Sequence, residues 1–229
     1  MKKLFVLMLL CAGCATQTTS QKPKQADGGL KPLFNGKDLT GWVQHGGKAL
    51  YRVENGEIVG TTVPNTPNSF LCTARDYTNF IFEVDFKVDP RMNSGIQIRS
   101  QVFEKETVLQ LKDKTIKIPA DRVHGYQVEI DPSKRAWSGG IYDEGRRGWL
   151  FDLKDKPDAQ KAFKQGEWNH YRVECRGDSI KTWINGVPAA DLKDGMTPAG
   201  LIALQVHGIG KKEDVMEVRW RNVRLQELP

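Results

Sequence analysis

The feature that most constrains the fold is an alternation of apolar and polar residues that recurs along most of the 229-residue chain. In residues 79–89, NFIFEVDFKVD, every second side chain is phenylalanine or valine, and most of those between are charged. Similar runs occupy residues 95–100, 125–131, 170–175, 179–186, 200–208 and 215–228. A period of two residues is typical of β-strands that bury one face. The pattern therefore predicts a chain built almost entirely of strands.

Turn-forming dipeptides separate these runs, and helix-forming sequence is scarce. Asn-Gly pairs stand at residues 35–36, 55–56 and 185–186, and Asp-Pro pairs at 89–90 and 131–132. Many short strands with regular turns predict an all-β fold, a jelly-roll sandwich of two antiparallel sheets. Residues 156–166 are compatible with one or two helical turns. The charged residues 104–123 interrupt the strand pattern, and we interpret them as a hairpin or flap near a site.

The N-terminal residues indicate export. MKKLFVLMLLCAGCATQ combines two lysines, a short apolar run and small residues before a cysteine, as secretory signals do. We predict a signal peptide over residues 1–13, a lipid-modified Cys14, a flexible tether over 14–31 and one folded domain over 32–229. This organisation predicts an outer-membrane lipoprotein on the periplasmic side, held to the membrane by its lipid alone. A cleaved signal without lipid is the alternative.

Charge and cysteine content narrow the function further. The formal net charge of +6 is scattered along the chain, and together with export it argues against a nucleic-acid partner. Cys72 and Cys175 lie in separate predicted strands. They could form a disulfide in an oxidising compartment or remain two buried thiols. Their spacing matches no zinc motif.

Six strings together resemble the 3-keto-disaccharide hydrolase family. They are PLFNGKDLTGW, NSGIQIRS, GYQVEIDPSKRAWSGGIYDEGRRGWL, GEWNHYRVECRGDSIKTWINGV, GLIALQVHG and VRWRNVRLQEL. The resemblance covers nearly all of residues 32–228. It implies a concanavalin A-like jelly roll, a small carbohydrate substrate, and activity on glycosides that carry a ketone at C3.

The chemistry of such a substrate determines which catalytic groups a site would need. The C3 carbonyl acidifies the proton on C2, so that a base can remove it to give an enolate. The enolate then expels the C1 substituent, and water adds back to the enone. This route requires a base near C2, an electrophile near the C3 oxygen, and a proton donor near the leaving group. A divalent metal could be the electrophile.

Strand parity supplies four candidate catalytic residues: Glu129, Asp131, His207 and Arg99. Glu129 and Asp131 are two residues apart on one strand face, about 6.5–7 Å. Their charges should repel, so one of the two should have a raised pKa if it is shielded from water. The alternatives are a solvated strand face for the two acids and a salt bridge to one of them for Arg99.

A second group of residues is predicted to bind the sugar. Three glutamines share the face of the acids, and residues 142–149 combine charged and aromatic side chains, a mixture suited to sugar recognition. The predicted substrate-binding residues are Gln97, Gln127, Gln205, Tyr142, Asp143, Glu144, Arg147 and Trp149. A metal set of His124, Glu129 and His207 is conceivable, although no ligand spacing supports it. A solvated loop with Trp149 in the core is the alternative.

Two rival functions remain at this point. A laminarinase-type glucanase needs a second glutamate on the strand of its first, about 5–5.5 Å from it. Here Ser133 and Lys134 stand where that acid belongs, which argues against the mechanism. A non-catalytic, lectin-like carbohydrate-binding module would have the same fold and is not excluded by the sequence.

Overall fold

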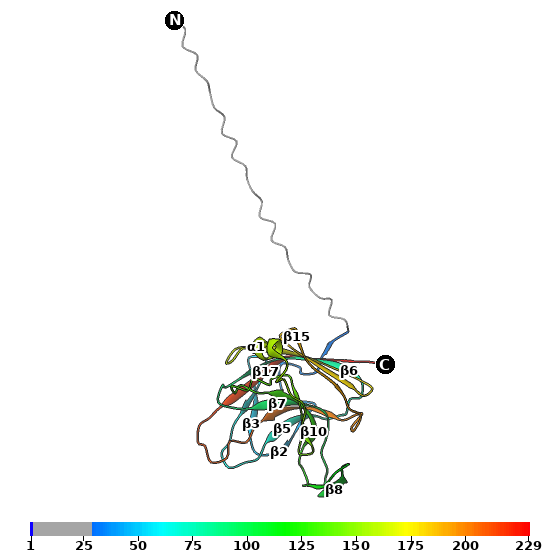
Figure 1. The fold of residues 1–229 in the computed structure, drawn as a ribbon. Coiled ribbons are helices and arrows are strands. Elements are labelled where there is room, and N and C mark those ends of the chain that lie inside the picture. Colours follow the sequence, from blue (N-terminus) through cyan, green and yellow to red (C-terminus); the bar gives the residue numbers. More distant parts are fainter. Residues whose placement is uncertain (2–28) are drawn as a thin grey trace.

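Two stacked antiparallel sheets form the body of the protein, as the computed structural model shows for residue 1 and residues 29–229 (Figure 1). The predicted all-β jelly-roll fold is therefore confirmed. The predicted signal peptide, Cys14 and most of the tether lie outside the described residues. Within the described part of the chain, no helix is both long enough and apolar enough to span a bilayer.

The elements follow the predicted alternation closely. The eight-stranded sheet contains, in spatial order, β15 (Val187–Lys193), β14 (Ser179–Ile184), β13 (Asn169–Arg176), β6 (Phe80–Val88), β17 (Glu217–Glu227), β4 (Glu57–Thr61) and β3 (Leu50–Glu54), with β1 (Lys31–Pro32) beside β17. The seven-stranded sheet contains β12 (Gly148–Phe151), β11 (Ile141–Glu144), β10 (His124–Ile130), β7 (Ser94–Gln101), β16 (Leu201–Val206), β5 (Ser69–Thr73) and β2 (Trp42–Gly46). The remaining elements are the hairpin β8 (Thr107–Gln110)–β9 (Thr115–Ile118) and the short helix α1 (Pro157–Ala162).

One apolar core fills the space between the sheets. In β6, Phe82 and Val84 point inward and are fully buried, and they join the same cluster as Ile96 of β7 and Val128 of β10. Burying a side chain of this kind contributes about 1.5–3 kcal/mol to folding. The core therefore accounts for the inward half of the alternation.

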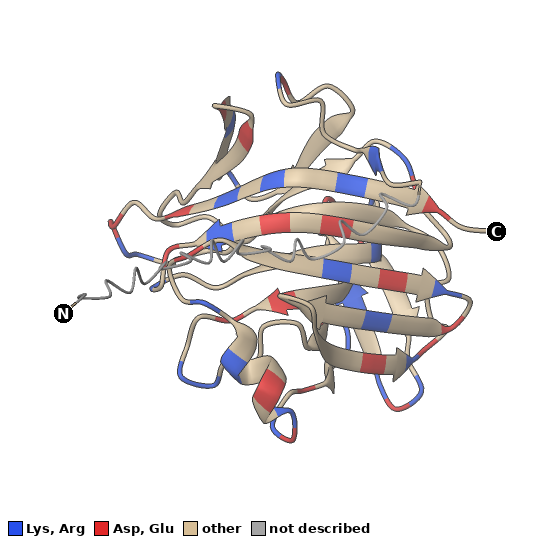
Figure 2. Cartoon of the chain, turned by 90° about the horizontal axis from the view of Figure 1, so that it is seen from above, with Lys and Arg blue, Asp and Glu red and all other residues tan. Residues whose placement is uncertain are grey.

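The outer face of the eight-stranded sheet is a lattice of ion pairs. Figure 2 shows bands of Lys and Arg alternating with bands of Asp and Glu across these strands. Carboxylate oxygens of Glu83 lie 2.7 Å from a guanidinium nitrogen of Arg172 and 3.0 Å from one of Arg224. A carboxylate oxygen of Asp85 lies 2.8 Å from Nδ1 of His170. The acids of this face, such as Glu83 and Asp85, pair with basic side chains of neighbouring strands.

The outer face of the seven-stranded sheet is different because most of its central residues are buried on both sides. Every residue of β10 and β16 is buried. The insertion at residues 102–123 covers part of this face, and its middle part forms the outlying β8–β9 hairpin (Figure 1). Its Asp121 accepts hydrogen bonds from His45 Nδ1 at 2.6 Å and Gly46 N at 3.0 Å. Its Val123 packs with Phe70 in a second apolar cluster.

Cys72 and Cys175 are free and buried, in β5 and β13 of opposite sheets. Of the two alternatives left by the sequence, the structure has the thiols and not the disulfide.

Arg99 does not share the face of Gln97, and this prediction was wrong. The register of β7 shifts against both β10 and β16 next to Arg99, which has a φ of +46°. Such a bulge interrupts the alternation of the strand, so that Arg99 no longer points to the same face as Gln97. The buried guanidinium donates to the carbonyl oxygens of Thr78 and Gly177, each at 2.7 Å. Arg99 therefore ties the seven-stranded sheet to turns of the other sheet.

We expect Arg99→Met to lower the free energy of unfolding by about 2–4 kcal/mol, because it leaves two carbonyl groups without their donor. Urea unfolding followed by tryptophan fluorescence measures the change. The matched control is Arg91→Met, which removes an exposed arginine paired with Asp89 and should cost less than about 0.5 kcal/mol. Equal losses in the two variants would contradict the tie between the sheets.

Candidate active site

A row of three glutamines crosses the outer face of the seven-stranded sheet. Gln127 Oε1 accepts hydrogen bonds from Gln97 Nε2 at 2.6 Å and from Gln205 Nε2 at 2.9 Å. The three residues come from the neighbouring strands β10, β7 and β16, and all are buried. The strand-parity prediction that places them together is confirmed. Because both acceptor positions of the Gln127 carbonyl are used, its amide group is fixed in one orientation.

That orientation directs a donor to Glu129. Gln127 Nε2 donates to Glu129 Oε2 at 2.8 Å, and Asn93 Nδ2 donates to Glu129 Oε1 at 2.6 Å. Glu129 is only 5 % exposed. Burial raises the pKa of this carboxyl group, while the two amide donors oppose the rise. The residue thus has the property of a general base, a carboxylate that accepts a proton more readily than an ordinary glutamate does.

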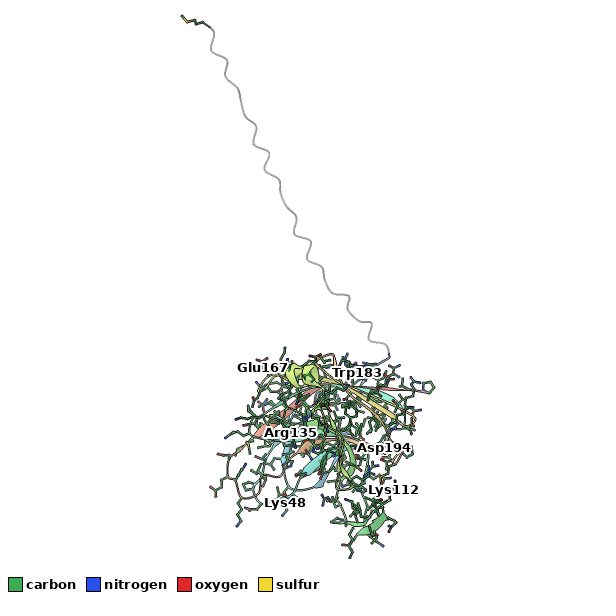
Figure 3. All side chains as sticks on the ribbon, in the orientation of Figure 1. Lys48, Lys112, Arg135, Glu167, Trp183 and Asp194 are labelled. Carbon is green, nitrogen blue, oxygen red and sulfur yellow. The ribbon has the colours of Figure 1, made fainter. Side chains whose placement is uncertain are left out.

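A pocket of about 330 Å³ opens above Glu129. Tyr142 and Trp149 line it, with their rings edge-to-face at a centroid distance of 5.4 Å. Arg135 also lines it, and its guanidinium carbon lies 5.1 Å from the centre of the Trp149 ring. Figure 3 labels Arg135 in the body of the molecule. Aromatic faces beside charged groups are the arrangement that binds the apolar face and the hydroxyls of a sugar.

A second buried carboxyl group, Glu144, lines the same pocket. Burial raises its pKa, and the charge of Arg122 partly offsets the effect. The Arg122 guanidinium is 3.5 Å away. Glu144 is two residues beyond Tyr142 on β11 and shares its face. The pocket therefore contains two shielded carboxyl groups from neighbouring strands.

His207 lies in the pocket wall, immediately after β16. Its Nδ1 is 2.7 Å from the carbonyl oxygen of Gly208. Because a carbonyl oxygen can only accept, Nδ1 carries the hydrogen, and Nε2 of the neutral ring is left as an acceptor.

Asp131 is not part of the pocket lining, contrary to its predicted place beside Glu129. Its carboxylate accepts hydrogen bonds from Arg135 Nε at 2.8 Å, Ser133 N at 3.1 Å and Trp137 N at 3.3 Å. Burial acts to raise its pKa, but the hydrogen bonds from Ser133 and Arg135 hold that pKa below its usual value. Asp131 therefore fixes the loop that carries Arg135. Of the two acids, the one with the raised pKa is Glu129.

Asp143 and Arg147 also lie away from the pocket, and their predicted role in sugar binding is not supported by their position. Asp143 alternates with Tyr142 and Glu144 along β11, so it faces the opposite side. It is fully buried and pairs with Arg146 at 2.7 Å and with Arg147. Arg147 also pairs with Asp194 at 2.8 Å. This cluster stabilises the turn between β11 and β12.

The suggested metal set of His124, Glu129 and His207 is not assembled. His124 is buried beside Phe103 at a centroid distance of 4.6 Å, and its Nδ1 donates to the carbonyl oxygen of Arg122 at 3.1 Å. Among residues 29–229, no group of three or more His, Cys, Asp or Glu side chains is placed to hold a metal ion.

The sequence did not single out Asn93, Arg135 or Arg122. Asn93 lies directly before β7 and reaches Glu129 because the pairing of Ser94 with Ile130 brings the end of β7 beside that acid. The signal available was its place in the NSGIQIRS string. Arg135 and Arg122 lie in irregular segments, where strand parity makes no prediction.

The chain matches one known protein family over most of its length. Residues 29–226 match the model of the 3-keto-alpha-glucoside-1,2-lyase-like domain. The chain belongs to this family. No curated protein matches it.

Solved structures with the same fold include a putative glycosyl hydrolase from Parabacteroides distasonis, with 21% identity, a TM-score of 0.59, and coverage of 91% of this chain and 98% of that one. A protein of unknown function with a galectin-like fold from Bacillus subtilis has 11% identity, a TM-score of 0.58, and coverage of 82% and 90%. The Emp47p carbohydrate recognition domain has 15% identity, a TM-score of 0.51, and coverage of 87% and 97%. At these identities the structures support the fold alone.

We expect Gly95→Ala to raise the pKa of Glu129 further. Gly95 lies opposite both Glu129 and Gln205, and an added Cβ would be 2.5 Å from Gln127 Cδ. Gln127 must then move and withdraw a hydrogen bond that favours the ionised carboxylate. NMR titration of ¹³C-labelled glutamate carboxyl groups measures the shift.

The matched control is Gly195→Ala, whose Cβ would meet only Asp178 Cβ at 3.8 Å. That variant should leave the titration of Glu129 as in the unaltered protein. A Glu129 pKa that does not change in Gly95→Ala would show that the glutamine row does not control this carboxyl group.

Proposed function

We propose that the protein cleaves 3-keto-glycosides by removing the C2 proton, eliminating the C1 substituent and adding water to the product. The observation that carries this proposal is the pair of buried carboxyl groups, Glu129 and Glu144, in one pocket with an aromatic wall. Membership of the lyase-like family supports cleavage across C1 and C2. Export as a lipoprotein, proposed from the N-terminal sequence, would place the reaction in the cell envelope.

Glu129 is the proposed base for the first step. Its two amide donors, at 2.6 Å and 2.8 Å, favour the ionised form that must accept the proton. When the carboxylate takes hydrogen from C2, the electron pair of that bond moves into the C3 carbonyl and forms an enolate. Arg135 lines the pocket and supplies the positive charge that stabilises the enolate oxygen.

Glu144 is the proposed acid for the second step. The enolate re-forms its carbonyl and breaks the bond from C1 to the leaving oxygen, which receives the Glu144 proton. The raised pKa of Glu144 keeps that proton available at higher pH than an ordinary glutamate does.

The same two groups complete the hydration. Glu144, now ionised, takes a proton from water as the water oxygen bonds to C1 of the enone. The Glu129 carboxyl proton exchanges with water while the enone is bound, Glu129 then delivers a proton to C2, and both carboxyl groups regain their starting states. His207 Nε2, an acceptor in the neutral ring, is placed to bind a sugar hydroxyl or this water.

A lectin-like module would use the same fold and the same aromatic wall. It has no need for two carboxyl groups shielded from water, because burying an acid costs stability and the raised pKa that results is useful to a group that exchanges protons in a reaction. The two functions differ in a turnover experiment, and binding without cleavage would identify the module.

We expect Glu144→Gln to separate two substrates that differ only in their leaving group. Methyl 3-keto-glucoside needs a proton on its leaving oxygen, whereas the p-nitrophenyl compound expels a stable anion. Loss of the general acid should lower kcat for the methyl compound by roughly 10²-fold or more. Turnover of the nitrophenyl compound should fall much less. Sugar release and nitrophenolate absorbance give the two rates.

Glu129→Gln is the matched variant, because C2 deprotonation precedes the departure of either group. It should abolish both activities while circular dichroism shows an intact fold. A Glu144→Gln enzyme that loses both activities equally would refute the assigned acid, and a Glu129→Gln enzyme with normal turnover would refute the assigned base.

A further inference from the structure

The end of the insertion brings a positive charge to the proposed acid, and none of the steps described above uses that charge. A guanidinium nitrogen of Arg122 lies 3.5 Å from a carboxylate oxygen of Glu144. The Glu144 side chain is only 11% exposed, whereas that of Arg122 is 49% exposed. A buried acid therefore has a partly solvated cation at ion-pair distance, and the contact is too long for a well-formed hydrogen bond.

The backbone that carries Arg122 is held at several points. Asp121 N donates to the carbonyl oxygen of Phe103 at 2.9 Å, which joins the two ends of the insertion. The Asp121 carboxylate accepts hydrogen bonds from β2 at 2.6 Å and 3.0 Å. Val123 is fully buried in an apolar cluster on the sheet. The β8–β9 hairpin extends away from the body (Figure 1), but the segment that carries Arg122 is fixed to the sheet.

The neighbouring strands leave room for the guanidinium. Gly145, in the turn after β11, has a φ of +69°, and a Cβ added there would be 3.3 Å from Arg122 Nε. Such a distance is tighter than most Cβ contacts, so a larger residue would press on the arginine side chain. The carbonyl oxygen of Arg122 accepts a hydrogen bond from His124 Nδ1 at 3.1 Å. Residues of β10 and of the β11–β12 turn therefore shape the place where the cation lies.

The other groups around Glu144 do not supply this charge. Asn68 donates a hydrogen bond to Glu144, but an amide carries no net charge. Arg135 also lines the pocket, where its Nε donates to Asp131 at 2.8 Å. The remaining ionisable side chains that line the pocket are Glu129, Tyr142 and His207. Among residues 29–229, Arg122 is the one arginine or lysine within ion-pair distance of Glu144.

The proposed elimination creates a negative charge at this place. When Glu144 gives its proton to the leaving oxygen, its carboxyl group becomes a carboxylate. An ionised carboxylate in a shielded site costs free energy unless an opposite charge lies near it. The Arg122 guanidinium supplies that charge, so it favours the release of the proton. In the hydration step Glu144 takes a proton back from water, and the attraction to Arg122 weakens again.

We propose that Arg122 is a positioning residue for the reaction, and that the insertion holds its charge where Glu144 becomes ionised. The proposal rests on the proposed function, because Arg122 acts through the acid assigned there. It gives the insertion a part in the chemistry, although the described residues of the insertion do not line the pocket above Glu129.

The test removes the charge and then restores it. Arg122→Met removes the guanidinium, and Arg122→Lys keeps a positive charge on a long side chain. Lys112→Met is the matched control, because it removes an exposed cation from the outlying β8–β9 hairpin of the same insertion, where Figure 3 labels Lys112. The rate constant kcat is measured against pH with methyl 3-keto-glucoside and with the p-nitrophenyl compound.

We expect Arg122→Met to lower kcat for the methyl compound by roughly tenfold, a part of what a general acid contributes. Turnover of the nitrophenyl compound should change by less than about twofold, because its leaving group departs as a stable anion. Arg122→Lys should recover most of the lost rate, and Lys112→Met should behave as the unaltered protein does. Equal losses with both substrates in Arg122→Met, no loss with either, or a loss that Arg122→Lys does not reduce would overturn the proposal.

The pH profile gives a second readout. Activity with the methyl compound should fall as the pH rises through the pKa of Glu144, because the acid then lacks its proton. Without the cation, less opposes the effect of burial, and the pKa of Glu144 should rise. The fall in activity should therefore move to higher pH in Arg122→Met. A profile that stays in place would contradict the action of Arg122 on Glu144.

Titration of the carboxyl group separates this proposal from the proposed function. NMR of ¹³C-labelled glutamate side chains should show a higher Glu144 pKa in Arg122→Met than in the unaltered protein or in Lys112→Met. If the unaltered protein cleaves neither compound, the proposed function is wrong, and the titration still decides whether the insertion acts on Glu144. An unchanged Glu144 titration in Arg122→Met would overturn the proposal whatever the activity.

Discussion

The proposed chemistry depends on one buried carboxylate, Glu129, that two amide groups hold in place. An acid in this environment is costly unless donors surround it, and the donors here are fixed by a hydrogen-bonded row across three strands. The row requires the register that sets Gln97 opposite Gln127, and it requires a residue without a side chain at Gly95. Strand pairing, and not a mobile loop, therefore sets the position of the proposed base.

The same alternating sequence pattern produces two different outer faces, one of solvated ion pairs and one of buried polar residues. On the eight-stranded sheet, acids such as Glu83 meet cations from adjacent strands, and the face is solvated. On the seven-stranded sheet, the insertion is hydrogen-bonded to β2 through Asp121, and its apolar contacts shield the neighbouring surface from water. On this sheet burial raises the pKa of Glu129 and of Glu144, and both groups hold a proton more readily than ordinary glutamates do.

Strand parity predicted the fold and the polar row, since regular strands alternate strictly. It failed where the backbone departs from regularity, as at Arg99, where the bulge turns the side chain toward the other sheet. It was not applied to residues 142–149, and there Asp143 faces away from its neighbours in β11. Arg135 lies in an irregular loop, where its Nε donates to Asp131 and its guanidinium lies over the Trp149 ring. A period-two strand pattern does not describe such a loop, so strand parity could not place Arg135 in the pocket.

The central claim is that cleavage proceeds through loss of the C2 proton, and the fate of that hydrogen tests it most directly. When a 3-keto-glycoside is cleaved in D₂O, the account predicts a released keto sugar that carries deuterium at C2, above the level of keto sugar left in D₂O without protein. Mass spectrometry and proton NMR locate the label. A product that keeps its original hydrogen at C2 would mean that the C1 bond breaks through an oxocarbenium-like state, and it would contradict the account.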